Sequence, residues 1–115
     1  MPLKVGGAFH TPLMAAAGAG MAEVVADVQL ADTVIPVVSN GDATAYTDGQ
    51  GWRRRMADHV MNPVRWRETQ LALAGMDVTT LLEVGPGEAL AGMAKRTVPD
   101  MQIRSLSAPD GEVTT

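Results

Sequence analysis

The stretch from Thr79 to Leu106 decides the fold, and it reads TTLLEVGPGEALAGMAKRTVPDMQIRSL. Residues 79–84 are β-branched or apolar and predict a strand, and a glycine-proline-glycine turn then leads into a helix over about 87–97. A final short strand is expected over 101–106. Because a helix separates the two strands, they are expected to pair in parallel. The stretch therefore predicts a βαβ unit of an α/β protein.

The chain before this stretch alternates in the same way. Apolar side chains at three- and four-residue steps predict a helix over 12–28, with Thr11 as its cap and Pro12 at its first position. Further elements are expected as a strand over 3–9, a buried strand over 34–38 ending in a turn at 39–42, a helix over 51–60, and a helix that Asn62 caps and that runs from Pro63 to about 74. This order predicts a layered sheet of mostly parallel strands with flanking helices.

The composition excludes several classes of protein. The 115 residues include no cysteine, which excludes disulfides and a cysteine nucleophile, and only two histidines, so we expect no metal site. A formal net charge of −4 argues against nucleic acid as a partner. No apolar run reaches the ~18 residues of a membrane span, and no leader opens the sequence, so we expect no membrane association and a cytoplasmic location.

His10 is the first candidate for chemistry. It lies in the segment GAFHTPLM at residues 7–14, on a short loop between the strand and the helix that are expected on either side. Loops of this kind are where α/β folds place their functional groups. An imidazole titrates near neutral pH and suits a general base that activates a hydroxyl. The alternative is a histidine that only satisfies hydrogen bonds at the start of a helix.

A base of this kind needs a nucleophile, and the sequence offers none. No Gly-x-Ser-x-Gly segment is present, and Ser39 ends a strand without the flanking glycines of a nucleophile elbow. Ser39 opens the segment SNGD at residues 39–42. This segment is either a solvent turn or a turn in which Asn40 lends its amide to the wall of an active site.

Two further segments have competing interpretations. Gly85-Pro86-Gly87 lacks the lysine and hydroxyl residue that end a phosphate loop, so a rigid strand-to-helix turn is favoured. Arginines at positions 53–55 are typical of a solvated helix face, and the alternative is a site for the phosphates of coenzyme A.

Four segments in one order resemble the malonyl-CoA:acyl carrier protein transacylases and the acyltransferase domains of fatty acid and polyketide synthases. They are GAFHTPLM at 7–14, VVSNGD at 37–42, NPVRW at 62–66 and EVGPG at 83–87, the last followed by Leu90, Lys95 and Arg96. The resemblance covers nearly all of residues 3–106. It implies the C-terminal portion of the large, α/β-hydrolase-like subdomain of that family for residues 1–106. From the sequence itself, residues 107–115 are expected to form a frayed tail.

The resemblance also implies roles for individual residues. The family transfers malonyl from malonyl-CoA to a serine and then to the phosphopantetheine thiol of acyl carrier protein, with no bound cofactor. His10 matches the catalytic histidine, and Asn40 matches an asparagine of the active-site wall. In the family a backbone carbonyl just before the Asn-Pro-Val segment orients the catalytic histidine. That position is His59 here, where the family usually has glutamine.

Other parts of the family pattern have no counterpart in these residues. The serine elbow, the oxyanion-hole glutamine, the malonyl-binding arginine and a small ferredoxin-like subdomain all lie N-terminal to this region in the family. We therefore expect a segment that supplies the histidine but not the serine, is inactive alone, and associates with the missing N-terminal portion or with itself. The alternatives are a non-catalytic module that binds a carrier protein or a partner acyltransferase, and a structural remnant.

Overall fold

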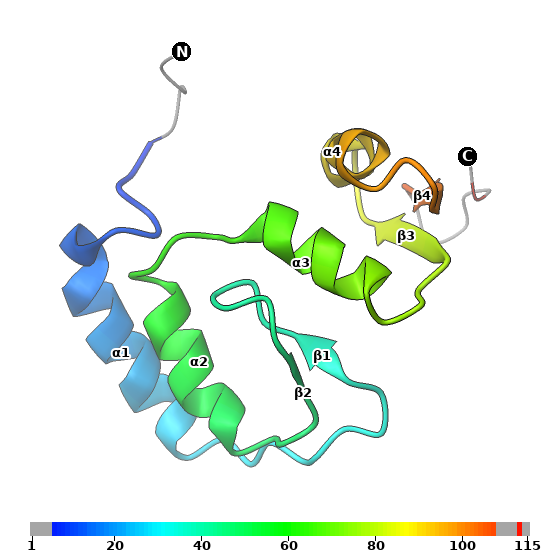
Figure 1. Cartoon of the computed structure of the whole chain (residues 1–115). Coiled ribbons are helices and arrows are strands. Elements are labelled where there is room, and N and C mark those ends of the chain that lie inside the picture. The colour runs from blue at the N-terminus through cyan, green and yellow to red at the C-terminus, as the bar shows by residue number, and fades with distance from the viewer. Residues whose placement is uncertain (1–5, 108–112, 114–115) are drawn as a thin grey trace. The chain divides into compact units, whose positions relative to one another are not determined.

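The computed structural model describes residues 6–107 and residue 113. The chain is divided into two compact units, which are unit 1 (Met1–Trp66) and unit 2 (Arg67–Thr115). Figure 1 shows the elements, which are η1 (Pro12–Met14), α1 (Ala15–Ala26), β1 (Val37–Val38), β2 (Ala45–Tyr46), α2 (Gly51–His59), α3 (Trp66–Ala74), β3 (Thr80–Val84), α4 (Ala89–Thr97) and β4 (Gln102–Leu106).

Unit 2 has the βαβ arrangement predicted from its sequence. Strands β3 and β4 pair in parallel, with Thr80 opposite Gln102 and Val84 opposite Leu106, and α4 connects them. Its core consists of small and medium apolar side chains from α4, β4 and the turn between them, which are Ala91, Ala94, Val98, Met101 and Ile103, and partly buried Leu73, Val78 and Leu81 pack against these. Hydrophobic burial therefore holds unit 2 together.

Helices α1 and α2 lie side by side in unit 1 (Figure 1). Gly18 of α1 lies close to Met61, two residues after the end of α2, because an added Cβ would lie 3.0 Å from the Met61 sulfur. Val25 of α1 and Ala57 of α2 are the buried hydrophobic residues among the described part of this unit. Unit 1 thus has a much smaller apolar core than unit 2.

The prediction of a strand over 34–38 is mostly wrong. Only Val37 and Val38 form a strand, which pairs antiparallel with β2, so residues 37–46 make a hairpin that the sequence analysis missed. Val34 and Ile35 are 98% and 79% exposed rather than buried. Pro36 has no N–H to donate, so the ladder has no hydrogen bond from this residue. The predicted turn at 39–42 is confirmed, since it closes this hairpin with a hydrogen bond from Ala43 N–H to the Ser39 carbonyl at 2.8 Å.

The N-terminal predictions are partly wrong. Residues 6–9 form bends and turns rather than a strand, because two consecutive glycines offer no side chain for a pleated surface, and residues 3–5 lie outside the described residues. The helix predicted over 12–28 is confirmed as η1 followed by α1, with Pro12 first. Thr11 is not a side-chain cap, since its hydroxyl donates to the Ala8 carbonyl at 2.7 Å. Most of the predicted tail over 107–115 lies outside the described residues.

The helix predicted from Pro63 begins three residues later, at Trp66. Asn62 does not cap it, because the Asn62 side-chain amide donates to the Asp58 carbonyl at 2.6 Å and so closes the end of α2 instead. The end of α3 at Ala74, just before Gly75, agrees with the prediction. Helix α2 was predicted to within a residue.

Candidate active site

His10 lies in the loop before η1 and is tied to the end of α2. Its φ of 62° is left-handed, a conformation that costs a non-glycine residue on the order of 1–3 kcal/mol. Two contacts compensate for this strain. The His10 backbone N–H donates to the Val60 carbonyl at 3.1 Å, and the Nδ1 atom of His10 lies 2.8 Å from the carbonyl oxygen of His59. The loop is therefore fixed by two consecutive carbonyls.

The second contact determines the tautomer of His10. A carbonyl oxygen only accepts hydrogen bonds, so Nδ1 is the atom that carries the proton, and Nε2 of the neutral ring is left as a proton acceptor. The accepting carbonyl belongs to His59, the last residue of α2, so the end of this helix fixes the orientation of the His10 ring. A histidine in this tautomer offers Nε2 as a proton acceptor, which is what a general base requires.

The ring of His59 lies beside that of His10. Their centroids are 4.8 Å apart, and the ring planes are tilted by 53°. The Nδ1 atom of His59 is buried and has no hydrogen-bond partner. Burial lowers the pKa of His59, and the charge of His10 lowers it further. His59 is therefore held in its neutral form next to the candidate base.

Asn40 lies in the hairpin turn of unit 1. Its backbone carbonyl accepts a hydrogen bond from the Arg65 N–H at 2.7 Å, which ties the turn to the segment after α2. The neighbouring Ser39 is buried, and its hydroxyl oxygen accepts a hydrogen bond from the Gly41 N–H at 3.2 Å. Ser39 is thus part of the turn, in keeping with its poor match to a nucleophile elbow.

A cavity of about 310 Å³ opens in unit 1 next to His59. Of the three site residues expected from sequence, His59 lines this cavity, and His10 and Asn40 do not. Most of the residues that line it have polar or charged side chains, and the lining consists of Ser39, Gly41, Asp42, Tyr46, Arg54, Arg55, Asp58, His59, Asn62, Pro63 and Arg65. Burial raises the pKa of Asp42, but hydrogen bonds led by the one from Tyr46 outweigh this effect and leave that pKa lowered.

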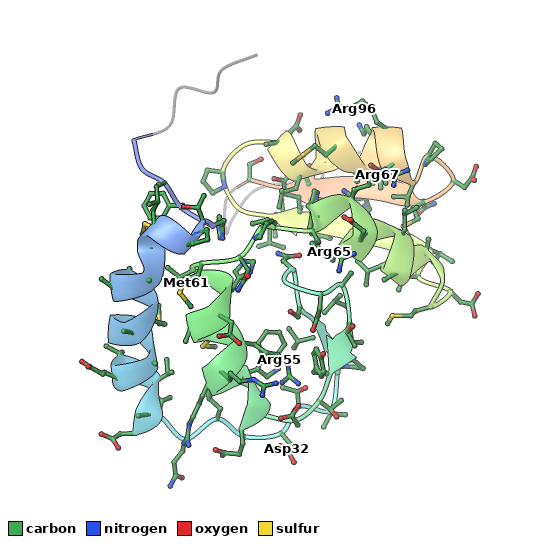
Figure 2. The ribbon with its side chains drawn as sticks, turned by 60° about the vertical axis from the view of Figure 1, so that its left-hand side comes forward. Asp32, Arg55, Met61, Arg65, Arg67 and Arg96 are labelled. Carbon is green, nitrogen blue, oxygen red and sulfur yellow. The ribbon has the colours of Figure 1, made fainter. Side chains whose placement is uncertain are left out.

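Arg55 packs within unit 1, a contact that the sequence did not indicate. Its guanidinium carbon lies 3.3 Å from the centre of the Tyr46 ring and 5.6 Å from that of Trp52. Figure 2 shows Arg55 directed from α2 toward the hairpin. Its Nη1 donates to Asp48 at 2.9 Å, and this hydrogen bond lowers the pKa of Asp48. The spacing of Trp52 and Arg55, three residues apart on a helix, is the signal that could have indicated the stack.

The other two arginines of the run differ from Arg55 and from each other. The guanidinium of Arg53 donates to the Val28 carbonyl, with Nε at 2.9 Å, and so fastens the chain that leaves α1. The side chain of Arg54 is 84% exposed and lies 3.9 Å from Asp58. The interpretation as a solvated helix face is therefore right for Arg54 and wrong for Arg53 and Arg55.

The Gly85-Pro86-Gly87 segment forms the predicted strand-to-helix turn. Gly85 and Gly87 have φ values of 144° and 91°, which L side chains rarely adopt. The carboxylate of Glu83 accepts hydrogen bonds from the N–H groups of Leu90 and Ala91 at 3.2 and 2.7 Å. Because a side chain already satisfies these N-terminal amides, the turn does not resemble a phosphate loop.

Within residues 6–107 and 113, no group of three or more acidic, histidine or cysteine side chains is placed to hold a metal ion. The helices in this part of the chain are all too short or too polar to span a membrane.

An α/β chain that presents a histidine with Nε2 as a proton acceptor carries a group that can act as a general base. No model of a protein family matches the sequence. Individual proteins match it closely, and the malonyl CoA-acyl carrier protein transacylase of Synechocystis sp. is 36% identical over 110 residues, which are 96% of this chain and 38% of that protein. The crystal structure of the transacylase from Synechocystis sp. PCC 6803 superposes with a TM-score of 0.89, at 35% identity, over 96% of this chain and 38% of the other.

Another similar protein is a malonyl transacylase solved in complex with the acyl carrier protein of a type II polyketide synthase. It has a TM-score of 0.86 and 32% identity, over 93% of this chain and 35% of that one. The chain therefore belongs to the malonyl-CoA:acyl carrier protein transacylase family and corresponds to its C-terminal part. It spans little more than a third of the length of the curated relatives it matches. The predicted partial α/β fold, with a parallel strand pair and flanking helices, is confirmed.

Proposed function

We propose that this chain is the histidine-bearing part of an enzyme that transfers malonyl from malonyl-CoA to acyl carrier protein through an acyl-serine intermediate. The observation that carries the proposal is the contact of 2.8 Å between His10 Nδ1 and the His59 carbonyl, because it leaves Nε2 free to exchange protons. The family of the chain supports the same activity. Residues 1–106 would be the C-terminal portion of the large subdomain, and the cytoplasmic location remains a prediction.

The reaction has two halves in which His10 acts alternately as base and acid. In the first, Nε2 takes the proton of a serine hydroxyl, the serine oxygen attacks the malonyl thioester, and the carbon–sulfur bond breaks. The departing coenzyme A sulfur then takes the proton from His10. In the second half, the carrier thiol gives its proton to His10 and attacks the acyl-serine, whose oxygen regains a proton. The serine would come from the portion of the family that this chain does not match.

Two partners follow from this proposal. The solved complex of a similar transacylase with an acyl carrier protein supports a carrier protein as the acceptor of the malonyl group. The other partner is the N-terminal portion of the enzyme, or a second copy of the chain. Large apolar side chains such as Leu13, Val24 and Val84 are more than 70% exposed, as surfaces that another chain covers would be.

A chimera tests the proposal, in which this chain replaces the matching segment of the Synechocystis transacylase. We expect malonyl transfer to a carrier protein, measured by intact mass, and a loss of about 10²–10⁴-fold in rate on His10→Ala, the usual contribution of a general base. Glu23→Ala, on the exposed side of α1, is the matched control and should change little. Transfer by the His10→Ala chimera within a few-fold of its parent would refute His10 as the base.

A second candidate function is a non-catalytic module that binds a carrier protein or a partner acyltransferase. The absence of a Gly-x-Ser-x-Gly segment from the sequence favours it for the chain taken alone. It predicts that the chain binds an acyl carrier protein but that the mass of the carrier protein does not increase by a malonyl group. It also predicts that a correctly folded chimera is inactive.

A further inference from the structure

Both histidines of the chain lie in one place. The sequence has two, and the rings of His10 and His59 are 4.8 Å apart although 49 residues separate them. The orienting contact to His10 uses only the backbone carbonyl of His59, which any residue supplies. The proposed reaction therefore leaves the imidazole of His59 without an assigned role, and the resemblance leads one to expect a glutamine at this position.

Two parts of unit 1 lie close to the His59 ring. The His10 ring is one, and the hairpin turn is the other, since a Cβ built on Gly41 would lie 3.8 Å from His59 Nδ1. That nitrogen is buried and has no hydrogen-bond partner. A ring packed in this way limits the space in which the His10 ring can rotate away from the carbonyl.

The charged surroundings of His59 do not favour a second positive charge. The titratable and charged groups that line the cavity with it are Asp42 and Tyr46 of the hairpin, Arg54, Arg55 and Asp58 of α2, and Arg65. The two carboxylates have other partners, since Asp42 accepts a hydrogen bond from the Tyr46 hydroxyl at 2.7 Å and Asp58 lies 3.9 Å from Arg54. His10 adds another group that becomes positive during proton transfer. A proton on His59 would thus meet little compensation.

We propose that the neutral imidazole of His59 is a positioning residue, which holds the His10 ring against the His59 carbonyl and releases it when His59 is protonated. His59 exchanges no proton with the substrate. The role of the pair in malonyl transfer rests on the proposed function, whereas the pairing itself does not. The loss of activity at acid pH would then report on the protonation of His59.

Histidine NMR on the chain itself tests the pairing, because two histidines give two resolvable ring signals. We expect the His59 signal to titrate below the ordinary range of a histidine, near 6.5, and His10→Gln to shift that midpoint upward by removing the neighbouring charge. His59→Gln keeps the carbonyl and removes the ring, so we expect it to broaden the His10 signal. Glu23→Gln, a charge change on α1, is the control and should leave the His59 midpoint in place.

Three results would overturn the inference. They are an unshifted His59 midpoint, a midpoint that does not respond to His10→Gln, and random-coil shifts for both rings. The chimera assay separates this inference from the proposed function. If the two histidines titrate together but the chimera transfers no malonyl, the pairing is supported and the proposed function is contradicted. If the chimera transfers malonyl but the histidines do not titrate together, the proposed function is supported and the pairing is contradicted. In an active chimera, His59→Gln should move the acid limb of the pH–rate profile to lower pH.

Discussion

The two units of this chain are stabilised by different interactions. Unit 2 buries a contiguous apolar cluster between α4 and β4. Unit 1 buries few apolar side chains and is fastened by polar contacts to backbone carbonyls and by the stack of Arg55 on Tyr46. The candidate active site lies entirely in unit 1, which polar contacts hold together. Hydrophobic burial has no preferred direction, so it stabilises a unit without fixing the orientation of any one side chain. Hydrogen bonds are directional, so they can hold the ring of His10 in one orientation.

Ile103→Ala should have the largest effect on stability. Ile103 is 8% exposed in the core of unit 2, and truncation of a buried isoleucine costs about 2–5 kcal/mol from lost burial and the cavity left behind. Urea unfolding of the chain and hydrogen exchange at the amides of β4 measure the loss. Leu82→Ala removes a side chain that is 47% exposed in the neighbouring strand and serves as the control. Equal losses for both variants would show that the cluster is not the core.

Gly49→Ala should be the next largest effect, and it acts in unit 1. A Cβ at this position would collide with the backbone carbonyl oxygens of Leu30 and Ala31, which cannot rotate away as a side chain can. We expect a loss of about 3 kcal/mol, the upper part of the range for overpacking. Gly20→Ala is the matched control, because an added Cβ there meets no atom within 4 Å and alanine favours a helix. An unchanged urea midpoint for Gly49→Ala would contradict the packing described.

Arg55→Met should cost less, about 1 kcal/mol, because methionine keeps part of the apolar contact with Tyr46 and loses the cation–π attraction. Its ion pair with Asp48 adds little, since the carboxylate is exposed. Arg54→Met, at the exposed neighbour, should lie within about 0.5 kcal/mol of the parent. If the two variants lose the same stability, the stack on Tyr46 does not hold the hairpin.

The pH dependence of stability should show the smallest effect. The pKa of His59 is lowered on folding, so the unfolded chain binds more protons below about pH 6.5, and stability should fall as pH drops through that range. Asp42, whose pKa is also lowered, should add a separate loss only below about pH 4. His59→Gln should remove the first loss and keep the second. Thermal melts between pH 8 and pH 4 would measure both, and a first loss that persists in His59→Gln would not come from this ring.

The sequence predicted unit 2 better than unit 1, and the reason is physical. Strand, turn, helix and strand in unit 2 are local patterns that bury their own apolar faces, so periodicity alone indicated β3, α4 and β4. In unit 1, the apolar run at 34–38 indicated a buried strand, yet Pro36 limits its pairing and Ile35 is exposed. Short antiparallel pairs such as β1 with β2 leave almost no periodic signal.

In the candidate site, too, the sequence indicated features that depend on local pattern and did not indicate those that depend on tertiary contacts. His10 was singled out by its position before a helix, and the resemblance suggested a carbonyl partner at His59. No spacing in the sequence reveals that the two rings pack together, or that Arg55 stacks on Tyr46. Likewise Asn62 resembled a helix cap, but its amide is used to close α2. Contacts of this kind depend on how the chain returns on itself, which local patterns do not encode.

The most direct test of the account is the tautomer of His10, because the proposed chemistry requires its Nδ1 proton to bond the His59 carbonyl and its Nε2 to be free. Nitrogen-15 NMR of histidine-labelled chain, at a pH where the ring is neutral, distinguishes the two nitrogens by their shifts and proton couplings. We predict that His10 is in the Nδ1–H form. A ring that is mainly in the Nε2–H form would contradict the carbonyl contact and the assignment of Nε2 as the catalytic base.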